Sequence, residues 1–185
     1  MLGLAVEGHA IVSADGMIAA SDGAMPESLQ HEADWRVFQA ALDRASLVVL
    51  GRKGHARHPN PGRRRLVVTG SVAGLETDPQ DPRATFWNPA GLGIERVLAE
   101  LGIKTGSLAI TGGTGVFGLF LPHYTRFFLS EVQALVLPEG LPTFRAGHPR
   151  SVLSAAGLRP EALEILDENP LVTLTTWTRS AAEGG

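Results

Sequence analysis

The sequence contains no cysteine, so neither disulfide bonds nor thiolate ligands for a metal ion are available to it. It has no apolar run that approaches the length of a membrane span, and its N-terminal segment lacks the basic region and apolar core of a secretory signal. Neither sign of charge dominates, and a formal net charge of -3 argues against an extended nucleic-acid surface. We therefore expect a cytoplasmic protein without membrane or nucleic-acid partners.

The chain also lacks internal repeats and low-complexity linkers. Its 185 residues suit one globular domain with a sizeable core. We expect this domain to span residues 1–179 and to be followed by a disordered tail at 180–185. The six histidines are scattered, and Pro59 argues against a helical pairing of His55 with His58. No metal site is expected.

Short apolar runs alternate with amphipathic segments, which is typical of an α/β domain. The segment 31–44 predicts a helix, because Trp35, Phe38, Ala41 and Leu42 fall on one face. The other predicted helices are 92–101 and 116–121. The predicted strands in this part of the chain are 6–13, 17–20, 47–50, 65–69, 85–87, 108–110 and 126–132.

The pattern changes after residue 132. Glycines and prolines punctuate the passage 138–149, which we expect to be a loop. Apolar residues then alternate with polar ones in 161–166 and in 171–178, which predicts an antiparallel pair at a sheet edge with one solvated face. The sequence thus predicts a sheet that is parallel in the middle, with antiparallel additions.

Three predicted strands end in a glycine with a polar or basic residue beside it: Gly51, Gly70 and Gly112. In an open α/β sheet, ligands bind beyond the carboxyl ends of the strands. The three ends together predict an extended, phosphate-bearing ligand that lies across one edge of the sheet.

The glycine-rich turn after residue 110 is the most specific of these ends. Gly112, Gly113 and Gly115 would let the backbone approach a pyrophosphate closely, while Thr114 offers a hydroxyl and Val116 an amide. The alternative is a tight turn that needs glycine only for its backbone conformation.

The other two ends carry donors for a second phosphate. Arg52 offers a planar guanidinium and Ser71 a hydroxyl, the pair that an adenosine 2′-phosphate needs. NADPH is therefore expected in preference to NADH. The alternative for Arg52, and the preferred interpretation of Lys53, is a solvated surface cation.

Asp34 at the start of the predicted helix is the candidate catalytic acid. In a cleft, its carboxylate would hold a nitrogen heterocycle by paired hydrogen bonds and help to protonate it. Phe38 lies one helical turn further on, where it can pack against the ring, and Ser130 can orient the carboxylate. The alternatives are a favourable charge at a helix N-terminus for Asp34 and an ordinary sheet-surface serine for Ser130.

These segments together resemble a known fold. Their order is SADGMIA, DWRVF, LVVLGRK, RRLVVTGS, AITGGTGVFGLFLP and FFLSEV. The chain resembles the dihydrofolate reductase-like fold, shared by dihydrofolate reductase and the C-terminal reductase domain of the bacterial riboflavin biosynthesis protein RibD. The resemblance implies three layers: a central, mostly parallel sheet with an antiparallel C-terminal strand pair, and helices on both faces.

The resemblance also implies roles for individual residues. The substrate would lie against Asp34, Phe38 and Ser130. The residues implied at the phosphates, the adenosine ribose and the nicotinamide of NADPH are Gly51, Arg52, Lys53, Thr69, Gly70, Ser71, Gly112, Gly113, Thr114, Gly115, Val116 and Phe117.

The segment SADGMIA favours the riboflavin branch, where its serine and aspartate, here Ser13 and Asp15, lie by the substrate and the nicotinamide. Glu27 stands where dihydrofolate reductases have tryptophan. Against the riboflavin branch, Thr111 stands where its members usually have a glutamate before the double glycine. Gly54 stands where the family often has a threonine.

The resemblance therefore implies an NADPH-dependent reductase of the RibD C-terminal type. It would act on 5-amino-6-(5-phosphoribosylamino)uracil or a similar pyrimidine, as a homodimer, with Asp34 and Asp15 as catalytic residues. Dihydrofolate reductase is the second expectation. A non-catalytic nucleotide-binding protein of the same fold is the third.

Overall fold

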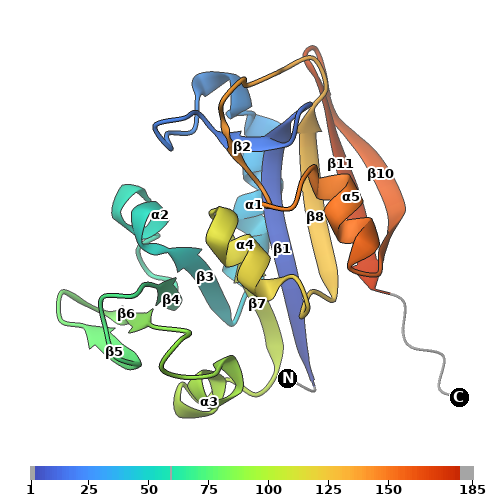
Figure 1. Cartoon of the computed structure of the whole chain (residues 1–185). Coiled ribbons are helices and arrows are strands. Elements are labelled where there is room, and N and C mark those ends of the chain that lie inside the picture. The colour runs from blue at the N-terminus through green and yellow to red at the C-terminus, as the bar shows by residue number, and fades with distance from the viewer. Residues whose placement is uncertain (1–2, 59, 180–185) are drawn as a thin grey trace, which may run out of the picture.

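A nine-stranded sheet runs through the middle of the molecule (Figure 1). The computed structural model describes residues 3–58 and 60–179, so the tail expected at 180–185 lies outside the described residues. The strand order is β10-β11-β8-β1-β7-β3-β4-β6-β5. The strands are β1 (Leu4–Ser13), β3 (Leu47–Gly51), β4 (Arg65–Val68), β5 (Leu75–Asp78), β6 (Asp81–Trp87), β7 (Gly106–Ile110), β8 (Arg126–Val132), β10 (Leu158–Glu168) and β11 (Leu171–Arg179). A second, two-stranded sheet pairs β2 (Met17–Ala19) with β9 (Leu141–Pro142).

The sheet is parallel in its centre and antiparallel at its edges. β1 lies between β7 and β8 and is parallel to both, and β3, β4 and β6 continue in the same direction. β11 pairs antiparallel with β8 and with β10, and β5 pairs antiparallel with β6. The mostly parallel sheet and its antiparallel C-terminal strand pair are thereby confirmed.

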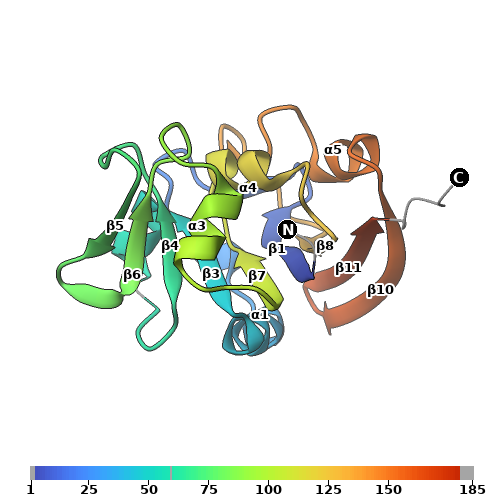
Figure 2. The same ribbon diagram turned by 90° about the horizontal axis from the view of Figure 1, so that it is seen from below.

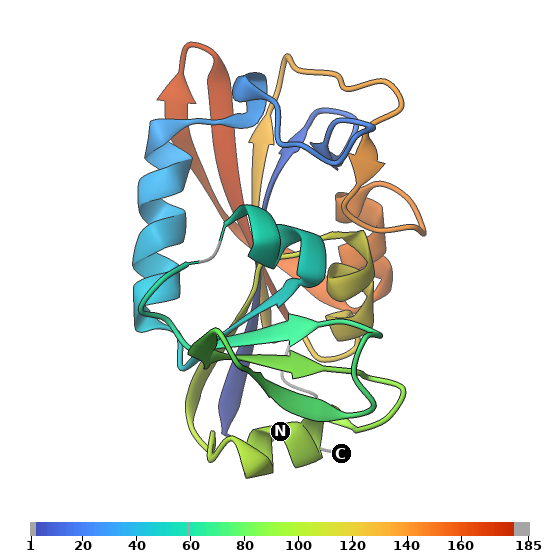
Figure 3. The same cartoon turned by 90° about the vertical axis from the view of Figure 1, so that its left-hand side faces the viewer.

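Helices cover both faces of this sheet, as expected (Figures 2 and 3). α1 (Glu32–Arg44) lies on one face, and α3 (Ile94–Glu100), α4 (Thr114–Phe120) and α5 (Pro149–Ala155) lie on the other. α2 (Arg52–Arg57) follows the carboxyl end of β3, and the 3-10 turn η1 (Glu27–Leu29) precedes α1. In the part of the chain that the structure describes, no helix is long and apolar enough to cross a membrane.

The strand β3 shows how the two layers are held. Its residues alternate between the faces, so Leu47 and Val49 pack in the larger core with α3 and α4, while Val48 and Leu50 pack against Leu42 of α1. All of them are buried. Burial on both sides explains why this run is apolar without alternation.

Two helices were not expected. α5 begins at Pro149 inside the passage expected to be a loop, because proline at the first helical position lacks only an N–H that would be unpaired there. The His148 ring accepts a hydrogen bond from the Arg150 amide and caps the helix. α2 is short, contains Gly54 and buries no residue, so it has no apolar periodicity to find.

The C-terminal edge differs from the prediction in its burial. β11 is buried through Val172 and Leu174, but β10 is exposed over most of its length. Leu163 is 62% exposed and Ile165 59%, so the apolar face expected for this strand is uncovered.

Candidate functional site

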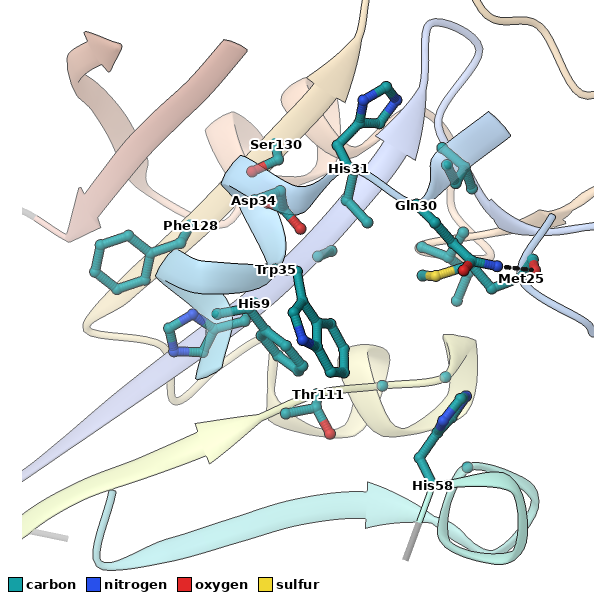
Figure 4. Close-up of a pocket in the computed structure, with 18 of the residues that line it drawn as sticks. His9, Met25, Gln30, His31, Asp34, Trp35, His58, Thr111, Phe128 and Ser130 are labelled. Atoms are coloured by element: carbon teal, nitrogen blue, oxygen red, sulfur yellow. Dashed lines mark hydrogen bonds between the residues drawn. The ribbon is translucent and has the colours of Figure 1, made fainter. Parts of the chain in front are cut away.

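A cavity of about 740 Å³ opens between α1, the central strands and the glycine-rich turn (Figure 4). It brings together residues that lie far apart in the sequence. The predicted site residues that line it are Asp34, Phe38, Ser130, Gly112, Gly113 and Phe117. The predicted site residues that do not line it are Ser13, Asp15, Gly51, Arg52, Lys53, Thr69, Gly70, Ser71, Thr114, Gly115 and Val116.

The Asp34 carboxyl group lies beside the Ser130 hydroxyl at one end of the cavity (Figure 4). α1 supplies Asp34 from its first turn, and β8 supplies Ser130 from the facing strand. Burial raises the pKa of Asp34, against the opposing effects of the Ser130 hydrogen bond and of nearby His31. The carboxyl group can therefore hold a proton closer to neutral pH than an exposed aspartate does.

Aromatic rings form the wall beside Asp34. Phe38 and Trp35 lie 5.8 Å apart between ring centroids, and both line the cavity. Trp35 is 53% exposed, although it lies on the apolar face of the helix. Its indole stands at the cavity instead, where a flat ligand ring can pack against it.

His9 was not predicted as a site residue. It lies on β1, stacked on Phe128 at 4.9 Å between centroids, with Phe38 edge-on at 6.2 Å. Burial, with the charge of Arg44, lowers the pKa of His9 to about 4, so the imidazole is neutral at physiological pH. Its Nε2 atom is buried and has no hydrogen-bond partner among the residues that the structure describes.

The only sequence signal for His9 is a single polar ring in an otherwise apolar part of the strand.

The histidines do not form a metal site: within residues 3–58 and 60–179, no three His, Asp or Glu side chains are placed to hold a metal ion.

The ends of β3 and β7 meet, as the sequence predicts. The Gly51 amide donates a hydrogen bond to the Gly112 carbonyl oxygen at 2.9 Å, and the Thr111 amide donates one to the Val49 carbonyl oxygen at 2.9 Å. Gly112 has a φ of +94°, and a Cβ atom there would lie 2.5 Å from the Phe117 ring. Glycine is therefore required at position 112 by both its backbone and its neighbours.

Two predicted donors at this turn are engaged inside the protein. The Thr114 hydroxyl donates to the Pro142 carbonyl oxygen at 2.5 Å, and the Val116 amide donates to Gly113 at 2.9 Å. Among the described residues, the amides of Thr114 and Gly115 have no protein acceptor. The turn therefore presents these two amides, whereas the Thr114 hydroxyl and the Val116 amide are already engaged.

The second group of predicted residues lies along the same edge of the sheet. The Arg52 guanidinium carbon is 4.6 Å from the centre of the Phe86 ring. At the end of β4 the hydroxyls of Thr69 and Ser71 are hydrogen-bonded at 3.0 Å. Lys53 is exposed, and the space around Gly70 is open.

Ser13 and Asp15 have a different environment. The Ser13 hydroxyl donates to Asp15 at 2.5 Å, and the Leu137 amide donates to both carboxylate oxygens at 3.1 and 3.2 Å. Burial raises the pKa of Asp15, but these hydrogen bonds together hold it below its usual value. The pair ties the turn after β1 to the loop after β8.

Comparisons with known proteins agree with this architecture. No protein-family model matches the chain, and no curated protein sequence does. A dihydrofolate reductase from Enterococcus faecalis, complexed with NADP(H) and RAB-propyl, superposes with a TM-score of 0.67 at 19% identity, over 96% of this chain and 97% of that one. A candidate riboflavin biosynthesis protein from Shewanella sp. PV-4 superposes with a TM-score of 0.67 at 18% identity, over 96% of this chain and 99% of that one.

A third solved structure comes from Thermotoga maritima and is a diaminohydroxyphosphoribosylaminopyrimidine deaminase/5-amino-6-(5-phosphoribosylamino)uracil reductase. It gives a TM-score of 0.67 at 16% identity, over 96% of this chain and 57% of that one. The strand order, the helices on both faces and these superpositions lead to one conclusion. The chain has the dihydrofolate reductase-like fold.

Proposed function

We propose that the protein is an NADPH-dependent reductase that transfers a hydride to a pyrimidine- or pterin-like heterocycle. One observation carries the proposal: the half-buried Asp34 side chain and the Gly112-Gly113 turn line the same cavity. A ring held by Asp34 would therefore lie next to the strand end at which a dinucleotide is expected.

The residues along the sheet edge fit such a dinucleotide. Gly51 and Gly112 adjoin through a backbone hydrogen bond, and neither residue adds a side chain of its own at these strand ends. The amides of Thr114 and Gly115 would face the pyrophosphate. Arg52 with the Thr69 and Ser71 hydroxyls would take the 2′-phosphate. When bound, the cofactor supplies the hydride, and the Enterococcus faecalis neighbour is complexed with NADP(H).

The residues of the cavity would bind and orient the substrate. An ionised Asp34 accepts two hydrogen bonds from a ring N–H and an exocyclic amine, and a protonated Asp34 donates to a ring nitrogen. Ser130 holds the carboxyl group in one orientation. Phe38 and Trp35 pack against the faces of the ring and exclude water.

The first candidate substrate is 5-amino-6-(5-phosphoribosylamino)uracil. It is favoured by the segment SADGMIA, by Glu27, and by the neighbours from Shewanella and Thermotoga. The chain spans 57% of the length of the Thermotoga protein. We therefore propose for this chain the reductase activity in that protein's name and not the deaminase activity. Dihydrofolate is the second candidate, favoured by the pairing of Asp34 with Ser130.

The experiment is a measurement of NADPH oxidation with each substrate, using the wild type, Asp34→Asn and the control Asp43→Asn. Asp43 is an exposed aspartate at the other end of the same helix. We expect turnover with one of the two substrates and unchanged turnover in the control. Asp34→Asn should abolish dihydrofolate reduction and impair a riboflavin-type reduction less. Quenching of NADPH fluorescence without turnover of either substrate would instead support a non-catalytic binding protein.

We extend the proposal to a homodimer in the cytoplasm, with residues 1–179 acting as one domain. The exposed apolar residues Leu163 and Ile165 on the edge strand β10 support a second copy of the chain as the partner. The absence of cysteine fits a reducing compartment.

A further inference from the structure

Arg52 reaches across the sheet from the end of one strand to a ring two strands away. It follows β3, whereas Phe86 belongs to β6, and β4 lies between these strands. Gly51 is in register with Val68, and Val67 with Phe86. A guanidinium 4.6 Å from the Phe86 centroid therefore lies beside the end of β4, where the Thr69 and Ser71 hydroxyls are.

The N–H donors of the Arg52 guanidinium are not used by any residue in the described part of the chain. Within the described ranges, Arg52 forms neither an ion pair nor a hydrogen bond, whereas Arg63 pairs with Asp43 and Arg65 with Asp81. Stacking on a ring fixes the plane of a guanidinium but leaves its N–H groups at the edge free. A planar fork of this kind matches two oxygens of a phosphate.

The Phe86 ring also contacts a second side chain, His55. The His55 ring meets it edge-on, at 6.2 Å between centroids and an interplanar angle of 80°. His55 Nε2 lies 3.7 Å from a carboxylate oxygen of Asp78, and the two side chains are only 14% and 13% exposed. α2 and β5 thus brace the ring on which Arg52 rests.

We propose that Phe86 is a positioning residue that determines specificity for a phosphate monoester on the adenosine ribose. It would keep Arg52 above the end of β4, so that guanidinium and hydroxyls meet the same phosphate. The inference rests on the proposed function, because NADPH and NADH differ only by this group. Removal of the ring would therefore weaken NADPH binding and leave NADH binding unchanged.

The test is isothermal titration of NADPH, NADH and 2′,5′-ADP, a fragment without nicotinamide. The proteins are the wild type, Phe86→Leu, Arg52→Ala, the double variant, and the conservative control Phe86→Tyr. We expect Phe86→Leu to weaken the binding of NADPH and of 2′,5′-ADP about two- to fivefold. NADH should not respond, and Phe86→Tyr should bind as the wild type does. In the Arg52→Ala background, Phe86→Leu should have no further effect.

Equal weakening of NADH, or an undiminished effect of Phe86→Leu without Arg52, would overturn the inference, since the ring would then act on the fold and not through the guanidinium. Thermal unfolding of each variant identifies such a loss of fold. If the wild type binds 2′,5′-ADP but neither dinucleotide, the result contradicts the proposed reductase function and supports the phosphate site at Arg52. If the wild type binds both dinucleotides equally and Phe86→Leu changes neither affinity, the result contradicts the phosphate site and agrees with the proposed reductase function.

Discussion

His9 should make the stability of the protein depend steeply on pH. Replacement by phenylalanine keeps an aromatic ring on Phe128 and removes both the proton and the unpaired Nε2 atom. Burial lowers the pKa of His9 from its ordinary 6.5 to about 4 in the folded state. In the unfolded chain the imidazole returns to its ordinary value and binds a proton more readily.

The sign and size of the effect follow from these two values. Below pH 6.5 the unfolded chain binds more protons than the folded one, so stability falls as the pH drops, and it continues to fall down to about pH 4. Between about pH 7.5 and about pH 5 this single group should remove about 2 kcal/mol of unfolding free energy. Over the same pH interval, the unfolding free energy of His9→Phe should fall by about 2 kcal/mol less than that of the wild type.

The assay is urea unfolding of the wild type and His9→Phe at the two pH values. His58→Asn is the matched control, because that side chain is exposed. Carboxyl groups titrate alike in all three proteins, so their contribution cancels in the comparison. An equal loss of stability in wild type and His9→Phe would refute the reasoning, because the His9 ring would then not be desolvated in the folded state.

Three further changes test other parts of the site. Asp34→Asn should raise the unfolding free energy at neutral pH by about 1 kcal/mol and the Tm by about 2–4 °C. The reason is that burial raises the pKa of Asp34, so the ionised form costs stability as the pH rises above the unfolded value. A lower Tm in thermal melts would contradict this. Asp15→Ala should cost about 1–3 kcal/mol in urea unfolding, because the Ser13 and Leu137 donors lose their acceptor. An unchanged midpoint would show that the loop is held by other contacts. Leu163→Lys with Ile165→Lys should convert a dimer to a monomer in light scattering and change monomer stability by less than about 0.5 kcal/mol. A dimer that persists would place the interface elsewhere.

The parts of the fold that sequence patterns predict are those with a local cause. Leu47–Leu50 is apolar without alternation because both faces of β3 are buried. The turn at Gly112 needs glycine for a positive φ and for the nearby Phe117 ring. α5 was missed for an equally local reason: Pro149 stops a helix in its interior but suits the first position.

The cavity could be predicted only in part, since its walls depend on which strands are neighbours. Asp34 and Phe38 share one helix, and their spacing is visible in the sequence. The contact of His9 with Phe128 follows from the register of β1 on β8, which no local pattern encodes. The position of Trp35 at the cavity also depends on the tertiary structure, because the apolar stripe of α1 lies partly over the cavity.

The central position of the first strand has a consequence for how the protein is made. Among the described residues, β1 has no partner strand in the first hundred positions, because it pairs with β7 and β8. A nascent chain emerging from the ribosome must therefore carry all of β1 unpaired until β7 has been added, and the second half of β1 until β8 has been added. Such late closure slows folding and exposes the strand to aggregation. Slower translation at low temperature, or a chaperone that shields residues 4–13, should therefore raise the yield of soluble protein.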